Sequence, residues 1–153
     1  MLSPIRIIES SEMRRVTEFM KQFELASKFV TVDIDHATKT YENMIDGGIA
    51  VVMVIEDQDG IAGSLGFIVS QDLHSGEKIM VETFWFTDPK KRGCGLLLLD
   101  AYEKYADEYN MDKIAMVHMM DSYPESLCKL YLRRGYELIE KHFVKTLNGR
   151  KET

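Results

Sequence analysis

The stretch from residue 90 to residue 95 has the composition of an anion-binding loop. It lies between a predicted strand over residues 79–87 and a predicted amphipathic helix over residues 95–110, and it reads Lys90, Lys91, Arg92, Gly93, Cys94, Gly95. Cations are unfavourable at a helix N-terminus unless an anion docks there, because the backbone dipole is already positive. Glycines let the backbone approach such a ligand and expose its N–H donors. The stretch predicts a phosphate site, and a tight turn with a solvated basic tip is the alternative.

Two common phosphate loops do not fit these residues. A Walker loop needs Gly-Lys-Ser/Thr, and a dinucleotide loop needs a third glycine. Leu96 and Leu98 stand where the third small residue would lie. The loop therefore belongs to another phosphate-binding class.

Glu82 is the candidate general base. Strict alternation over residues 79–87 places it on the strand face of Met80, Phe84 and Phe86, where an apolar setting raises the proton affinity of a carboxylate. Such a base could take a proton from an ammonium substrate, directly or through water. The alternative is a structural carboxylate paired with a neighbouring Lys, Arg or hydroxyl.

The cysteines and histidines show neither the pattern of a nucleophilic site nor that of a metal site. Cys94 lies at a helix N-terminus, where a thiolate would be stabilised, but no histidine is close in sequence to activate it as a nucleophile. The four histidines have no metal-ligand spacing with each other or with the cysteines, so we expect no metal.

Length and composition indicate one ordinary globular domain. The chain has 153 residues, of which 45% are hydrophobic and 29% charged. It contains no linker, repeat or low-complexity tract, so we expect a single domain over residues 1–148 and a flexible tail over residues 149–153.

The net charge disfavours some classes of binding partner, and the cysteine content indicates a cellular compartment. The net charge of −6 disfavours nucleic acid and anionic membranes. No apolar run approaches the roughly 20 residues of a membrane span, and no targeting signal is visible. Two cysteines cannot build a disulfide framework, and reduced thiols suit a cytoplasmic protein.

Hydrophobic periodicity predicts the elements that position these residues. We expect strands over residues 4–9, 49–56, 61–70, 79–87, 113–118, 136–140 and 142–147, and helices over residues 11–29, 37–46, 95–110 and 122–134. Ser10 or Ser11 is the expected cap of the first helix and Asp35 of the second. The pattern favours an α+β (mixed α/β) fold, in which helices flank a central, mostly antiparallel sheet.

These elements and the loop resemble the GNAT N-acetyltransferases. Their acetyl-CoA loop has the form Q/R-x-x-G-x-G/A after a strand, and residues 90–95 match it with Lys90 in the first position. The order of strands and helices is similar along nearly the whole chain, which implies a GNAT-like acyl-CoA N-acyltransferase fold. Residues 81–89 also resemble small members frequent in tailed-phage genomes.

The resemblance implies how acetyl-CoA binds. Backbone groups around Trp85, Phe86 and Thr87 would pair with the pantetheine arm, and N–H groups from Arg92 to Leu97 would hold the pyrophosphate. A strand whose partner splays away leaves unpaired groups that an amide-containing arm can satisfy. The implied cofactor contacts are therefore Trp85, Phe86, Thr87, Lys90, Arg92, Gly93, Cys94, Gly95, Leu96 and Leu97.

Tyr131 is the candidate general acid. Residues 130–136 resemble the family segment L-Y-x-x-x-G-F/Y, in which the phenol points toward the CoA sulfur and would protonate the departing thiolate. The alternative is a helix tyrosine packed on the sheet. Pro124 stands where many members carry an asparagine that contacts the cofactor.

The sequence thus predicts an enzyme that transfers acetyl from acetyl-CoA to a primary amine by direct attack. Its acidic charge favours cationic acceptors such as polyamines, aminoglycosides or lysine-rich segments. A non-catalytic acyl-CoA-binding or protein-interaction module on the same fold is the alternative, and an unrelated phosphate-ligand protein is a third interpretation. The exposed final strand pair could join two copies edge to edge as a homodimer.

Overall fold

The computed structural model of the chain describes residues 2–24, 30–91, 93–119 and 124–147. In this part of the chain, five strands form one sheet in the order β1-β2-β3-β4-β5. The strands are β1 (Arg6–Ile7), β2 (Ala50–Asp57), β3 (Gly60–Gln71), β4 (Lys78–Thr87) and β5 (Lys113–Ala115). The first four are antiparallel, whereas β5 runs parallel to β4. The predicted α+β class and mostly antiparallel sheet are confirmed.

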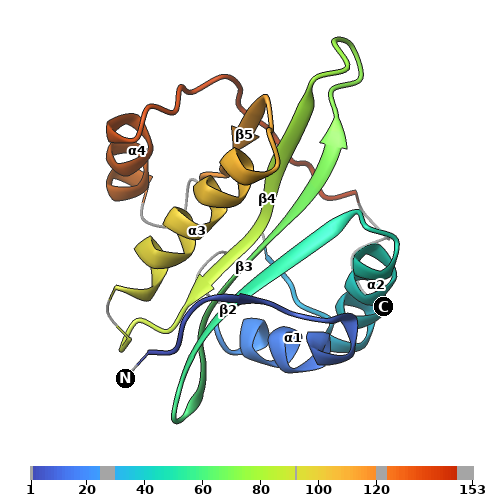
Figure 1. The fold of residues 1–153 in the computed structure, drawn as a ribbon, viewed down its shortest axis with the longest axis vertical. Helices are drawn as coiled ribbons and strands as arrows, with labels where there is room; N and C mark the ends of the chain where they lie inside the picture. Colours follow the sequence, from blue (N-terminus) through green and yellow to red (C-terminus); the bar gives the residue numbers. More distant parts are fainter. Residues whose placement is uncertain (1, 25–29, 92, 120–123, 148–153) are drawn as a thin grey trace.

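Helices cover both faces of this sheet (Figure 1). The short turn η1 (Ser10–Glu12), α1 (Met13–Gln22) and α2 (Ile34–Asp46) lie on one side, and α3 (Cys94–Glu108) and α4 (Pro124–Arg133) on the other. β2 is a nearly continuous apolar run because both of its faces are buried: Val52 and Val54 pack with α1, and Met53 and Ile55 with α3.

The helix starts differ from the expected caps. Asp33, not Asp35, caps α2 by accepting a hydrogen bond from the His36 N–H. At the first helix, no serine side chain caps the turn; instead Glu12 accepts from the Glu9 N–H. The α1 helix ends at Gln22 rather than residue 29, and the last part of that prediction, residues 25–29, lies outside the described residues.

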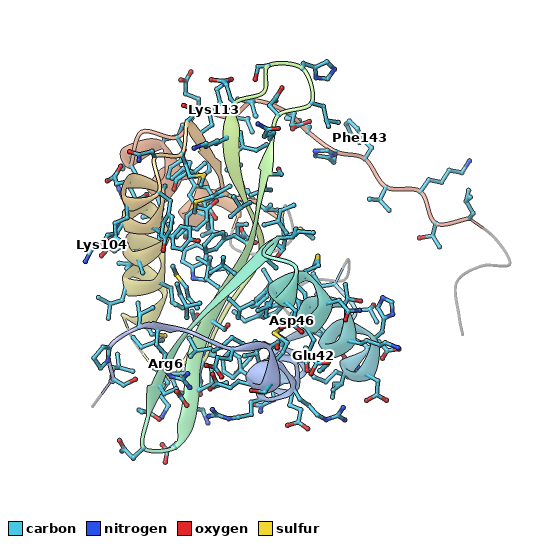
Figure 2. All side chains as sticks on the ribbon, turned by 45° about the vertical axis from the view of Figure 1, so that its right-hand side comes forward. Arg6, Glu42, Asp46, Lys104, Lys113 and Phe143 are labelled. Carbon is cyan, nitrogen blue, oxygen red and sulfur yellow. The ribbon has the colours of Figure 1, made fainter. Side chains whose placement is uncertain are left out.

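The two strands predicted over residues 136–140 and 142–147 are wrong. This segment carries no strand, and its apolar side chains are exposed, with Phe143 93% and Ile139 80% accessible. An alternating segment becomes a strand only beside a partner edge, and Figure 2 shows Phe143 on a segment that leaves the body of the molecule. The tail predicted over residues 149–153 lies outside the described residues.

A bulge in β4 changes which side chains share a face. The register with β3 shifts so that Phe67 is opposite Glu82 while the preceding residue of β3, Gly66, is opposite Phe84. Thr83 is therefore the extra residue, and it resets the alternation. Met80 and Trp85 pack on the α3 side, whereas Phe84 and Phe86 pack on the α1 and α2 side.

Gly66 is required by this arrangement. A methyl group at its Cα would lie 2.1 Å from Cε2 of the Phe84 ring. We expect Gly66→Ala to lower the free energy of unfolding by about 1–3 kcal/mol, because the buried ring must move. Urea denaturation measures this loss. In a Phe84→Leu background the same substitution should cost less, and an equal cost in both backgrounds would contradict the packing account.

Candidate active site

The site begins where β4 and β5 separate. Their parallel pairing is confined to Ile79–Val81 on β4 and Lys113–Ala115 on β5. Beyond that point the β4 edge that faces away from β3 has no strand partner within the described chain. Asp88 N–H donates to Ala62 O on β3, so strand alternation turns the backbone groups of Trp85 and Thr87 toward the open edge.

Because of this alternation, only two of the three residues that the resemblance implied as pantetheine contacts turn their backbone groups toward the open edge. Trp85 and Thr87 can offer N–H and C=O groups to a ligand along the open edge, as the splayed-strand argument expects. Phe86 is paired with Ser64 of β3 and packs its ring toward α1 and α2. Its backbone N–H and C=O groups therefore face β3 and not the open edge.

Tyr102 of α3 fixes the point of separation. Its hydroxyl oxygen lies 3.1 Å from Met80 O on β4 and 2.8 Å from Ala115 O on β5, and its side chain is fully buried. Burial is the main reason that the pKa of this phenol is raised. One hydroxyl group thus contacts both strands at the end of their pairing. The sequence showed Tyr102 only as part of an apolar helix face.

Glu82 occupies the mouth of this opening. Its side chain is buried, and Oε1 accepts a hydrogen bond of 3.0 Å from the Val117 N–H, just after β5. Burial raises the pKa of Glu82 to about 7, and the Val117 bond only partly opposes that rise. The prediction placed Glu82 with Met80, Phe84 and Phe86; the bulge leaves it with Met80 and moves both phenylalanines to the other face.

Tyr131 of α4 also forms a hydrogen bond with Val117. Its hydroxyl donates to Val117 O at 3.0 Å, so Val117 bonds Glu82 through its N–H and Tyr131 through its carbonyl. Burial and, second, the charge of Glu82 raise the pKa of Tyr131. The two predicted catalytic side chains are thus brought to one peptide segment. Val117 was missed because a backbone contact leaves no mark in the sequence.

The start of α3 has the features of an anion site. Gly93 is in the left-handed conformation with φ of 86°, no side chain among the described residues caps the helix, and its first turn contains no acidic residue. The N–H groups of Cys94, Gly95 and Leu96 precede the first intrahelical bond. Leu97 does not share this property, because its N–H donates to Gly93 O at 3.2 Å.

The three cations before this helix have different roles. Lys91 donates to Asp57 at 2.5 Å, at the end of β2, and to Asp59 at 3.0 Å in the β2–β3 turn, so its charge is balanced within the protein. Lys90 is exposed, and its backbone N–H donates to Asp88. Arg92, which the resemblance placed at the pyrophosphate, lies outside the described residues.

Cys94 is a core residue. Its thiol is buried and donates toward Lys91 O at 3.1 Å. Burial raises the pKa of this thiol despite the nearby backbone N–H groups. The helix start thus offers the Cys94 backbone to a ligand, and its sulfur packs inside the fold.

The raised pKa of Glu82 predicts a pH dependence of stability. The folded protein holds this proton up to about pH 7, whereas the unfolded chain releases it near pH 4.5, so the stability that it contributes is lost as the pH rises between these values. Urea denaturation at pH 5 and pH 8 should show wild type losing about 2–3 kcal/mol relative to Glu82→Gln. Asp46→Asn, at an exposed position, is the control and should follow wild type. Parallel curves for wild type and Glu82→Gln would contradict the burial of an ionisable group here.

Comparison with known proteins gives a clear result at the level of the fold. No family model matches the chain, and no curated protein matches it. Among solved structures, a predicted acetyltransferase from Clostridium acetobutylicum, crystallised with acetyl-CoA, is similar at TM-score 0.74 and 18% identity over 99% of this chain and 100% of that one.

Two further structures extend this likeness. A ribosomal-protein-alanine N-acetyltransferase from Brucella melitensis has TM-score 0.72 and 15% identity over 95% of this chain and 99% of that one. An aminoglycoside acetyltransferase from an uncultured soil metagenomic sample, in complex with sisomicin, has TM-score 0.70 and 18% identity over 96% and 97%. The chain therefore has the fold of these acetyltransferases, as its resemblance to the GNAT family implied.

Proposed function

We propose that this protein is an acetyl-CoA-dependent N-acetyltransferase whose acceptor is a primary amine. The observation that carries the proposal is the meeting of Glu82 and Tyr131 at Val117, beside the open edge of β4. A buried base with a pKa near 7 and a protonated phenol are the two groups that acetyl transfer to an amine needs. The shared fold supports the same reading.

The donor side of the proposal uses the β4 edge and the start of α3. The amide groups of the pantetheine arm would bond the backbone of Trp85 and Thr87, and the pyrophosphate would accept from the N–H groups at Gly95 and its neighbours. Lys90 supplies an exposed positive charge close to this helix start. Arg92 belongs to the proposal through the loop pattern alone.

The proposed reaction is direct attack. Glu82 takes a proton from the ammonium form of the acceptor, and the neutral nitrogen then forms a bond to the acetyl carbon while the carbon–sulfur bond breaks. The second proton that the nitrogen loses is released to solvent, and Tyr131 donates its own proton to the departing thiolate and later regains one from water. Glu82 releases its proton to solvent before the next turnover. No covalent link to the enzyme forms.

The two groups act on each other through charge. Part of the raised pKa of Tyr131 comes from the negative charge of Glu82, after the larger effect of burial. When Glu82 takes up the proton of the amine, that charge disappears and the pKa of Tyr131 falls. Proton uptake by the base thus makes the phenol a stronger acid at the step that requires it.

The class of acceptor is inferred from the net charge, and the cellular compartment from the free cysteines. The net charge of −6 favours cationic amines such as polyamines, aminoglycosides or lysine-rich segments. Two free cysteines suit a reducing cytoplasm, and within the described residues no helix is long and apolar enough to span a membrane. A homodimer stays a prediction, and the strand pair that was expected to form it is not present in residues 136–147.

Acetyl-CoA should stabilise the folded protein. At about 100 times its dissociation constant, a ligand raises the free energy of unfolding by roughly 2.7 kcal/mol, which for this size shifts the unfolding midpoint by about 5–10 °C. Thermal unfolding with acetyl-CoA, ATP and NAD measures the effect and its selectivity. Equal shifts with all three ligands would favour an unrelated phosphate-binding protein, and no shift with acetyl-CoA would overturn the proposal.

The catalytic roles predict a distinct pH profile. With spermidine, an aminoglycoside or a lysine peptide as acceptor, kcat/KM of wild type should rise with pH through about 7, where Glu82 loses its proton. Glu82→Gln should lose about 10²–10⁴ in kcat/KM together with this rise, and Tyr131→Phe should lower kcat while acetyl-CoA still binds. Full activity in both variants would contradict the assignment and favour a non-catalytic binding module if their biological effect also persisted.

A further inference from the structure

Two buried side-chain nitrogens without a hydrogen-bond partner among the described residues belong to rings that neighbour Tyr131. In the part of the chain that the structure describes, the buried side-chain nitrogen and oxygen atoms that lack a hydrogen-bond partner are Trp85 Nε1 and His118 Nε2. The Trp85 ring centre is 6.5 Å from that of Tyr131, and the His118 ring centre is 6.4 Å from it. A buried polar atom without a partner is costly, and its repetition around one ring marks a place for a polar ligand.

Trp85 is the more specific of the two markers. An indole nitrogen can only donate, so its partner must be an acceptor atom. The indole packs against the start of α3: a methyl group at Gly95 would lie 3.5 Å from Cζ2 and 3.8 Å from Nε1. The N–H group therefore lies close to the start of α3, on a ring that neighbours Tyr131.

We propose that the indole N–H of Trp85 donates a hydrogen bond to an oxygen of the acyl donor, between its pyrophosphate and its thioester. This inference rests on the proposed function and adds a side-chain contact to the backbone contacts described above. In this structure neighbouring atoms cover the nitrogen, so those atoms must move before the donor can reach it. Binding therefore changes the surroundings of the indole.

The chain offers an unusually direct test, because Trp85 is its single tryptophan. Titration of the full-length protein with acetyl-CoA should change the intrinsic tryptophan emission. Biosynthetic replacement of tryptophan by its benzothienyl analogue, in which sulfur stands in place of the N–H, then alters this position alone. Affinity for acetyl-CoA should fall about fivefold to tenfold, measured by calorimetry.

A second readout separates ligand binding from a structural role. Without ligand, the unfolding midpoint of the analogue protein should equal that of wild type, because the indole N–H has no bond to lose. Trp85→Phe should show the same loss of affinity, and Tyr109→Phe, on a ring that is 55% exposed, is the matched control and should bind like wild type.

Each contrary outcome has a definite meaning. If wild type binds acetyl-CoA but the analogue binds it equally well, the Trp85 contact is wrong and the proposed function stands. A lower midpoint of the ligand-free analogue would show an internal bond and also overturn the contact. Absence of acetyl-CoA binding by wild type would remove the proposed function itself.

S-acetylpantetheine and ADP identify the accepting oxygen. The first carries the arm and thioester without the pyrophosphate, and the second carries a pyrophosphate without the arm. Loss of affinity confined to S-acetylpantetheine would support the bond to a carbonyl of the arm, whereas loss confined to ADP would place the bond on a phosphate and overturn the proposed position. Unchanged affinity of both ligands in the analogue protein would overturn the contact.

Discussion

The hydrogen bond from the Val117 N–H to the buried carboxyl of Glu82 is the interaction around which the site is organised. It lies just past the last paired residues of β4 and β5. At this position the Val117 N–H bonds a titratable side chain of β4 instead of a backbone carbonyl. The parallel ladder could have continued past Val81. Instead the strands separate, and the edge that becomes free on β4 is the surface along which we place the acyl donor. The pKa of the carboxyl held there is raised because burial disfavours its charged form.

Three other features follow from this separation. Tyr102 holds the two strands together at the last point where they meet. The β4 bulge at Thr83 keeps Glu82 on the α3 side and sends Phe84 across to the α1 and α2 side, where its ring fills the space above Gly66. Because the bulge shifts the alternation by one residue, Trp85 also lies on the α3 side, next to the start of that helix. One extra residue in a strand thereby aligns the base, the indole and the helix terminus on one face.

The sequence predicted the parts of this arrangement that depend on local chemistry. The hairpin of β2 and β3, the apolar setting of Glu82 and the amphipathic α3 all follow from composition and periodicity. The faces of Phe84 and Phe86 did not, because a bulge is invisible to a count of alternate residues. The balanced charge of Lys91 depends on a turn that lies far away in the chain. Val117 contributes through its backbone, and residues 136–147 have the pattern of strands without the partner edge that a strand needs.

Amide hydrogen exchange of the full-length protein with and without acetyl-CoA tests the central claim most directly, because that claim concerns backbone groups. We expect acetyl-CoA to slow exchange at Trp85 and Thr87 on β4 and at Cys94, Gly95 and Leu96 at the start of α3. The Phe86 amide, which pairs with β3, should be slow in both states. Binding of acetyl-CoA that leaves the exchange of these five amides unchanged would place the ligand elsewhere and contradict the account.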